Sequence, residues 1–220
     1  MFEVRDLIDC RACPRLVHWR ESVASAKRAA FADQDYWGRP VPGLGDPDAP
    51  LFLVGLAPAA HGANRTGRMF TGDRSGDFLF SSLHRLGMAN QPTSIDFDDG
   101  LELTGVYITS AVKCAPPANK PTAIEQDTCG RWLAAELDRG PRVIVALGGL
   151  AFGRVVRMGA QLGWGPPVQP AKFGHGVRTR FETGPEMFGC YHPSQQNTFT
   201  GRLTPDMFDS VLGDALLAAR

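Results

Sequence analysis

The chain has 220 residues, with 23 basic and 23 acidic side chains and a hydrophobic content of 43%. This composition excludes a disordered chain, because disorder needs few apolar residues and a large net charge. The length indicates one domain, 1–220, with a core that needs no disulfide bonds. No apolar run approaches the ~18 residues of a membrane span. The N-terminal residues do not have the pattern of a secretory signal, so we expect a cytoplasmic location and no membrane association.

Alternating apolar runs and helical spacing predict an α/β protein. Pro14 divides the opening helical stretch, Thr122 and Glu125 form a capping box, and Thr204 precedes Pro205 as a helix start. In chain order we expect two helices over 2–30, an extended loop over 35–50, a strand over 51–56, a polar loop to 76, a helix over 77–86, a strand over 106–109, a helix over 122–138, a strand over 143–147, a helix over 148–157, a loop over 159–175, strands over 177–181 and 187–191, and a last helix from 205.

This alternation predicts a three-layer α/β/α sandwich around a mostly parallel central sheet. Ligands of such sheets bind at the carboxyl ends of the strands. Three loops with unusual polar content leave predicted strand ends, over residues 55–76, 110–121 and 192–203. These loops are the candidate functional region.

Five cysteines are present, an odd number that does not suggest a disulfide framework in a cytosolic chain. Cys10 and Cys13 form a chelating pair, Cys114 and Cys129 follow at a distance, and Cys190 lies in a predicted buried strand as a core thiol. One short pair with two scattered cysteines fits an iron–sulfur cluster at least as well as zinc. Free reduced cysteines remain the alternative.

The loop over 55–76 lacks the signatures of a P-loop, a dinucleotide fingerprint and a nucleophile elbow. It offers backbone amides that a ligand can approach closely, three arginines, Phe70 and Asp73. Asp73 precedes a predicted helix, which suits either a capping role or a positioned base. Phe70 suits either a stacking role or a core position, and a mobile surface loop is the simpler interpretation of the segment.

The loop over 192–203 begins with a histidine that leaves a buried strand. His192 precedes a proline and can donate a hydrogen bond into a crevice, although a structural histidine is an equal alternative. Phe199 and Leu203 are apolar residues in a polar loop, where they serve either as a wedge between bases or as anchors to the core. Side chains suited to phosphate or base-edge contacts are Asn197, Thr198, Thr200 and Arg202.

Together these segments resemble the uracil-DNA glycosylases, in particular the type b branch, family 5 of that superfamily. The resemblance covers nearly the whole chain and comprises several motifs in order. They are Cys10-Arg-Ala-Cys13-Pro-Arg-Leu, Gly55-Leu-Ala-Pro-Ala, Asn64-Arg-Thr-Gly-Arg, Phe70-Thr-Gly-Asp73, Lys113-Cys114-Ala-Pro-Pro, His192-Pro-Ser and Asn197-Thr-Phe-Thr-Gly-Arg-Leu.

The resemblance implies the uracil-DNA glycosylase fold and a monofunctional enzyme that flips uracil out of DNA and hydrolyses the N-glycosidic bond. It also implies a mainly structural [4Fe–4S] cluster on Cys10, Cys13, Cys114 and Cys129, which would tie the N-terminal helical segment to the rest of the domain. The expected partner is DNA that contains uracil or another deaminated base such as hypoxanthine. We expect a monomer that is associated with the nucleoid when it acts.

Residue roles follow from the same resemblance. Most relatives carry a polar residue for water handling where this chain has Ala57, and the resemblance moves that role to Asp73, with His192 as the second catalytic residue. Type a enzymes have an asparagine where this chain has Ser110, which implies a roomier base pocket. The remaining assignments are substrate binding by Ala57, Ala59, Asn64, Phe70 and Ser110, and DNA binding by Arg65, Arg68, Asn197, Phe199 and Arg202.

Two other functions fit the same residues. One is an iron–sulfur redox or sensor protein whose crevice binds a nucleotide. The other is a catalytically silent module that binds DNA lesions, which Ala57 makes conceivable. An assay of uracil excision would distinguish both of these alternatives from a glycosylase.

Overall fold

The computed structural model describes residues 4–169 and 172–220, so residues 2–3 of the expected first helix and 170–171 of the expected loop lie outside the description. The elements are α1 (Val4–Ile8), α2 (Pro14–Ala26), η1 (Ala29–Phe31), β1 (Leu44–Gly45), β2 (Leu51–Gly55), α3 (Ala63–Thr66), α4 (Arg74–Arg85), β3 (Val106–Ser110), η2 (Pro117–Asn119), α5 (Ala123–Leu137), β4 (Val143–Leu147), α6 (Gly149–Gln161), β5 (Arg178–Arg180), β6 (Glu186–Cys190), α7 (Gln195–Phe199) and α8 (Pro205–Ala219).

The strands form one sheet in the order β1-β3-β2-β4-β6-β5. The four central strands are parallel, and the two edge strands β1 and β5 pair antiparallel with their neighbours. β2, β3 and β4 are buried at every position, as apolar strands covered on both faces must be. The predicted mostly parallel sheet is confirmed.

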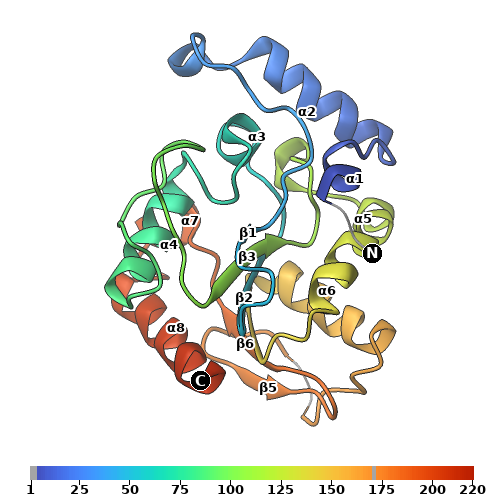
Figure 1. Cartoon of the computed structure of the whole chain (residues 1–220), viewed down its shortest axis with the longest axis vertical. Helices are drawn as coiled ribbons and strands as arrows, with labels where there is room; N and C mark the ends of the chain where they lie inside the picture. Colours follow the sequence, from blue (N-terminus) through green and yellow to red (C-terminus); the bar gives the residue numbers. More distant parts are fainter. Residues whose placement is uncertain (1–3, 170–171) are drawn as a thin grey trace.

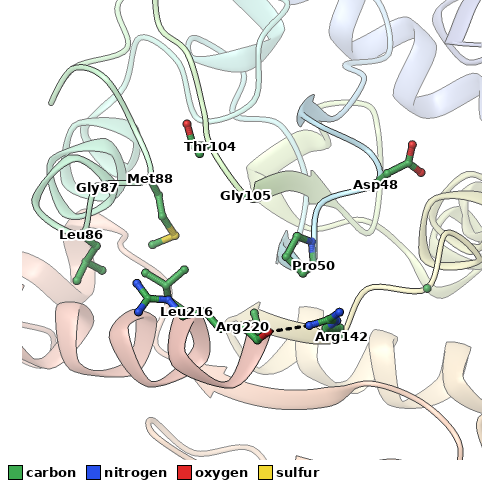
Figure 2. Close-up of a pocket in the computed structure, with 12 residues that line it drawn as sticks. Asp48, Pro50, Leu86, Gly87, Met88, Thr104, Gly105, Arg142, Leu216 and Arg220 are labelled. Atoms are coloured by element: carbon green, nitrogen blue, oxygen red, sulfur yellow. Dashed lines mark hydrogen bonds between the residues drawn. The ribbon is translucent and has the colours of Figure 1, made fainter.

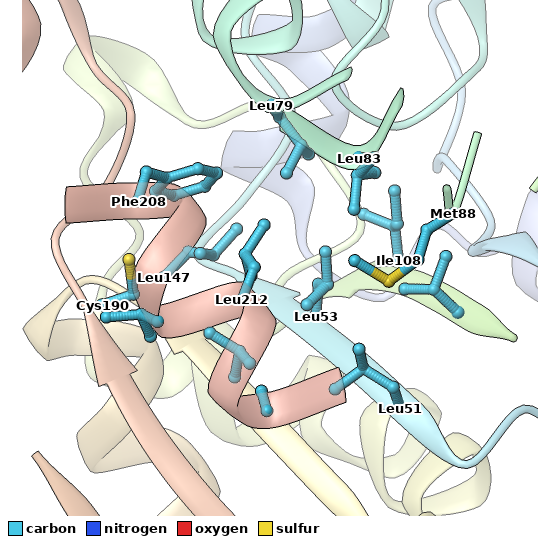
Figure 3. Packing of buried hydrophobic residues seen from close by; sticks show 14 of the residues in the cluster. Leu51, Leu53, Leu79, Leu83, Met88, Ile108, Leu147, Cys190, Phe208 and Leu212 are labelled. Atoms are coloured by element: carbon cyan, nitrogen blue, oxygen red, sulfur yellow. The ribbon is translucent and has the colours of Figure 1, made fainter. Parts of the chain in front are cut away.

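Helices cover both faces of this sheet (Figure 1). On one face α4 and α8 pack over the strands, and Figure 3 shows Leu79, Leu83, Phe208 and Leu212 meeting strand residues there. On the other face α5 and α6 supply a second buried cluster that includes Leu133, Leu137, Phe152, Val155 and Met158. The three-layer α/β/α sandwich is therefore confirmed.

The local signals that predicted helix starts are present. Pro14 occupies the first turn of α2, the Thr122 side chain accepts from the Glu125 amide in a complete capping box, and the Thr204 hydroxyl accepts from the Met207 amide. A capping side chain satisfies a backbone donor that has no partner within the helix, and each contributes about 1 kcal/mol.

Several elements differ from the expectation at their ends. α4 begins three residues early because Asp73 caps it, and α6 continues to Gln161. The short helices α3 and α7 lie inside two segments expected to be loops, and β1 lies inside the segment 35–50. These pieces have two to five residues, too few for a periodic pattern to be recognised. Within the described residues, no helix combines the length and the apolar character needed to cross a membrane.

Candidate active site and cysteine pocket

A groove of about 840 Å³ lies beside the loop that leaves the carboxyl end of β2. Ala59 and His61 line it from that loop, Asp73 and Arg74 from the start of α4, and Gln195 from the start of α7. Asn119 lines it from the loop after β3, so the groove joins all three loops that the sequence singled out. Its position agrees with the rule that ligands of parallel sheets bind at the carboxyl ends of strands.

Asp73 caps α4 and also faces the groove. Its Oδ1 accepts hydrogen bonds from the amides of Ser75 at 2.9 Å and Gly76 at 3.0 Å. Its Oδ2 lies against Gly62, where any Cβ would collide with the carboxylate. Burial raises the pKa of Asp73, and the two amide hydrogen bonds oppose that shift. The capping role is confirmed, because Oδ1 caps α4, and the role as a positioned base stays a prediction for Oδ2, which lies beside Gly62.

Phe70 holds a backbone conformation that bulky residues rarely adopt. Its φ is +53°, which costs about 1–3 kcal/mol and persists only where the surroundings enforce it. Its carbonyl packs so closely against Gly76 that a side chain there would clash, and its ring lies against Gly55. This strain orients the ring at the carboxyl end of β2.

His192 leaves the end of β6 and lies beside that ring. The two ring centroids are 5.9 Å apart with an interplanar angle of 29°. Burial lowers the pKa of His192 to about 4, so the imidazole is neutral at pH 7 and carries one N–H donor. The side-chain amide of Asn197 donates to the His192 carbonyl at 2.8 Å and fixes the His192 backbone.

The remaining predicted substrate-binding residues differ in their placement. Within the described residues the amides of Ala57 and Ala59 donate to no acceptor, so both are free to bind a ligand. Ser110 pairs with Gly55 at the carboxyl ends of β3 and β2, but its hydroxyl donates to the Val112 carbonyl at 2.9 Å. The Ser110 side chain is thus turned into its own loop, and the Phe70 ring packs beside Gly55.

Asn64 does not reach the groove. Its side chain is fully buried, and its amide donates to the carbonyls of Arg20 at 3.3 Å and Ala60 at 3.4 Å. The expected contact with a base is therefore replaced by a structural one. The asparagine instead ties α3 to α2.

Arg65 and Arg68 are largely buried and make internal contacts, although Arg65 also lines the groove, and the expectation that they contact DNA stays a prediction. Arg65 is 8% exposed and donates to the carbonyls of His61 and Gly72 and to Gln34. Arg68 is 5% exposed and pairs with Asp99 at 2.6 Å. A buried guanidinium must satisfy its donors within the protein, and both do so. Nothing in the sequence motif distinguishes an arginine that makes these internal hydrogen bonds from one that contacts a phosphate.

In the loop around α7, Phe199 and Leu203, the two apolar residues that the sequence analysis treated together, differ in burial. Leu203 is 1% exposed and anchors the loop in the core, whereas Phe199 is 72% exposed at the end of α7. Arg202 is exposed and places its guanidinium over the Tyr191 ring at 4.6 Å. Phe199 and Arg202 remain available to a ligand outside the groove.

The four cysteines of the expected cluster line one small cavity. Cys10 and Cys13 come from the segment between α1 and α2, Cys114 from the loop after β3, and Cys129 from α5. Apolar side chains, among them Leu16 and Trp132, complete the wall. Cys190 lies in the main core, away from this cavity, as expected.

The thiols of this cysteine pocket differ in acidity. Burial raises the pKa of Cys114 to about 11 and that of Cys129 to about 12, and it also raises the pKa of Cys13. Burial opposes ionisation of Cys10 as well, but hydrogen bonds from Ala12, Arg131 and Trp132 outweigh it and lower that pKa. A metal that binds here must therefore displace protons from the buried thiols.

Arg20 is the residue of this pocket that the sequence analysis missed. It is 2% exposed, and it donates to the Cys114 sulfur at 2.9 Å and to the Cys10 carbonyl at 3.2 Å. Its nearest carboxylate is Glu21, at 4.0 Å. A buried cation beside a neutral thiol is poorly compensated, whereas a metal-bound thiolate would compensate it. The available signal was spacing, since Arg20 follows Cys13 by seven residues, two turns of α2.

The arrangement of the cysteines bears on which metal group they could hold. Within the described residues, no three His, Cys, Asp or Glu side chains are placed to hold a single metal ion. A four-iron cluster does not require such convergence, because each thiolate binds a different iron. The donor set and the buried cation fit a cluster better than mononuclear zinc.

A second cavity, of about 610 Å³, lies at the opposite end of the strands (Figure 2). Pro50, Gly105 and Arg142, which precede β2, β3 and β4, line it together with the C-terminal residue Arg220. Arg142 donates to the Arg220 carbonyl at 2.8 Å. The cavity lies at the amino ends of the strands, far from the polar loops, and contains none of the predicted site residues.

A polar groove at the carboxyl ends of a parallel sheet, with the Asp73 carboxylate in its wall, is the arrangement in which α/β proteins bind ligands. Comparison with known sequences identifies the family. The profile of the uracil DNA glycosylase superfamily matches residues 42–216. The chain therefore belongs to the uracil DNA glycosylase superfamily, a class of hydrolytic enzymes.

Curated relatives support this assignment over almost the whole chain. A type-5 uracil-DNA glycosylase of Mycobacterium tuberculosis (strain CDC 1551 / Oshkosh) is 57% identical over 209 residues, which are 94% of this chain and 76% of the relative. The type-5 enzyme of Thermus thermophilus is 51% identical over 214 residues, 96% of this chain and 94% of the relative. That of Pyrobaculum aerophilum is 49% identical over 210 residues, 95% and 88% of the two chains.

Proposed function

We propose that the chain is a monofunctional DNA glycosylase that removes uracil, and also other deaminated bases such as hypoxanthine, and leaves an abasic site. The observation that carries this proposal is an arrangement at the carboxyl end of β2. The Phe70 ring packs against Gly55 and stacks on neutral His192, and Asp73, three residues after Phe70, lines the groove. The names of the type-5 relatives support the same activity.

Binding begins with extrusion of the base, which costs about a few kcal/mol and least at a mismatch such as U opposite G. The Phe70 ring, fixed by its left-handed backbone, offers a stacking surface for the flipped base. The free amides of Ala57 and Ala59 can donate to acceptors on the edge of the base. These contacts hold the base without any charged side chain.

Two side chains then act on the glycosidic bond. The bond between the sugar C1′ and the base nitrogen breaks, and its electron pair leaves with the base. The N–H of neutral His192 donates to the oxygen on which negative charge develops, a stabilisation of about 3–4 kcal/mol for an oxyanion-type donor. The free oxygen of Asp73 faces the positive sugar and orients the water whose oxygen forms the new bond to C1′. That water loses one proton to solvent, and the departed base anion takes up one proton from solvent.

The proposal also includes a range of substrates that extends beyond uracil. Ser110 is tied to its own loop and Gly55 lacks a side chain, so nothing at the paired strand ends offers an amide group that would read only uracil. A larger deaminated base, hypoxanthine, then fits the same space.

The cysteine pocket is proposed to hold a [4Fe–4S] cluster on Cys10, Cys13, Cys114 and Cys129. Such a cluster would supply structural cohesion between α2, α5 and the loop after β3. Arg20 and the Lys113 amide, which donates to Cys129 at 3.3 Å, would face its sulfur ligands. The pocket joins the N-terminal segment to the sheet, which agrees with a single domain over the whole chain.

The deciding experiment is base release under single-turnover conditions from duplexes that carry one U·G pair or one hypoxanthine. We expect cleavable abasic product from both, with uracil the faster because it is the smaller base to extrude. Replacement of Ser110 by asparagine should slow hypoxanthine release more than uracil release. A protein that binds both duplexes and releases neither base would instead be the silent lesion-binding module.

A further inference from the structure

The segment 27–37, which we call the strap, forms one wall of the groove that contains Asp73. Arg28, Phe31 and Gln34 line the groove from the strap, and Asp73 and Arg74 line it from α4. The strap follows α2, which lies at the same end of the molecule as α3 (Figure 1). Sequence motifs gave no reason to connect this segment with the site.

Arg65 fixes the strap to α3 through several contacts. Its guanidinium lies 4.1 Å from the centroid of the Phe31 ring and donates to Gln34 Oε1 at 2.6 Å. Its backbone carbonyl accepts from the Trp37 amide at 2.8 Å. Arg65 also donates to the Gly72 carbonyl, one residue before Asp73. One buried cation therefore sets the position of the strap and of the Asp73 loop together.

Tyr36 arranges a hydrogen-bond donor on the groove wall. Its hydroxyl accepts from the Arg28 amide at 3.4 Å and lies 3.0 Å from His61 Nδ1. Burial, together with the nearby Arg28 and Arg65, lowers the pKa of His61. In the neutral tautomer that carries its proton on Nε2, Nδ1 accepts from the tyrosine hydroxyl. His61 thus retains one N–H for a ligand in the groove.

The charges around the groove are uneven. Arg28, Arg74 and the inward-directed Arg65 face it, against the carboxylates of Asp73 and Asp77. Arg28 is exposed, and neither Arg28 nor Arg74 forms an ion pair within residues 4–169 and 172–220. Surface arginines without a carboxylate partner beside a ligand groove are suited to phosphate oxygens.

We propose that the strap is a DNA-binding element: Arg28 and His61 bind a backbone phosphate of the damaged strand on one side of the extruded nucleotide. The inference rests on the proposed glycosylase function, because it assumes that the groove receives DNA. The groove continues to Gln195 at the start of α7, so the strand passes from the exposed Phe199 and Arg202 loop across Asp73 to the strap. Phosphate contacts there hold the strand in register while the base is outside the helix.

The test is the salt dependence of binding to a duplex that carries a tetrahydrofuran abasic site, measured by fluorescence anisotropy. Loss of one phosphate contact in Arg28→Gln should reduce the slope of log K against log salt by about 0.9. Arg180→Gln is the matched control, because Arg180 is exposed on β5 at the opposite end of the molecule from α3 (Figure 1). Tyr36→Phe should weaken binding as well, because it removes the bridge that holds His61 Nδ1.

The outcomes separate this inference from the proposed function. If Arg28→Gln and Tyr36→Phe bind with the wild-type affinity and slope, the strap does not bind DNA, even where the wild-type protein releases uracil. The wild-type protein could instead release no uracil while Arg28→Gln alone shows the reduced slope of log K against log salt. The strap would then bind DNA, and the glycosylase proposal would be wrong. Thermal unfolding of both variants tests whether the substitutions at exposed Arg28 and half-buried Tyr36 leave the fold intact.

Discussion

The groove and the cysteine pocket both depend on loops at the carboxyl ends of β2 and β3, yet they are built differently. The groove is lined by polar groups such as His61 and Asp73, and the left-handed backbone of Phe70 lies in the same loop, three residues before Asp73. The cysteine pocket is lined by apolar groups, and its donors, from Arg20 and the Lys113 amide, are directed at sulfur. Ala57 packs against the pocket on one side and belongs to the substrate loop on the other.

This difference indicates that the groove and the cysteine pocket have separate roles, the first in activity and the second in stability. The groups proposed to act on a substrate are held by strain at Phe70 and by backbone hydrogen bonds at Asp73. Groups that must hold the fold together are removed from water. Changes in the groove should therefore alter the rate and spare stability, and changes in the pocket should do the reverse.

The largest effect is expected at Asp73. Asp73→Asn retains an N-cap residue of similar capping strength but removes the negative charge, so single-turnover release of uracil should fall by about 10²–10⁴-fold. Asp77→Asn is the control, since Asp77 is exposed in the same groove one turn into α4. Wild-type rates in a folded Asp73→Asn variant would remove Asp73 from the mechanism.

The next effect concerns His192 and pH. His192→Ala removes the donor and should slow release by about 10²–10³-fold. Because the pKa of His192 is lowered to about 4, the wild-type rate should be flat between pH 6 and 8. It should fall only in more acid solution, where Asp73, whose pKa is raised above its usual value, is protonated. An inflection near pH 6.5 would show that His192 titrates as an exposed histidine and contradict this role.

The same pKa shift has a consequence for stability. Between about pH 6.5 and pH 4 the unfolded chain binds a proton on His192 that the folded protein excludes. The free energy of unfolding therefore decreases as the pH falls through this range. The raised pKa of Asp73 acts in the opposite direction over the lower part of the range, so the net acid dependence of stability is reduced.

The smallest effect on the rate, but the largest on stability, is expected at the cysteine pocket. Cys129→Ser should lose bound iron and visible absorbance and lower Tm, by about 2–4 °C for each kcal/mol lost in a chain of this length. The fraction that stays folded should still release uracil. Cys190→Ala is the control, because Cys190 is buried outside the pocket and should leave the iron content unchanged. Stoichiometric zinc in place of iron would overturn the cluster assignment.

Part of the site could be predicted from the sequence because its signals are local. The chelating Cys10–Cys13 pair, the capping box at Thr122 and the apolar run of β2 each lie within a few residues, and such patterns act through nearest-neighbour geometry. They were enough to predict the sandwich and to direct attention to the polar loops at its carboxyl edge. The order of the family motifs along the chain added the identity of the enzyme class.

The tertiary structure alone decided which charges face a ligand. Arg65 and Arg68 have the same residue type and neighbourhood as phosphate-binding arginines, but both are buried by segments distant in sequence, around Gln34 and Asp99. Arg28, which no motif includes, lies on the groove wall and forms no ion pair with any residue that the structure describes. Burial is a property of the packed chain, and the cost of an unpaired buried charge forces each guanidinium to find its acceptors there. Sequence order contains the local patterns, and only packing determines which polar groups remain free to act.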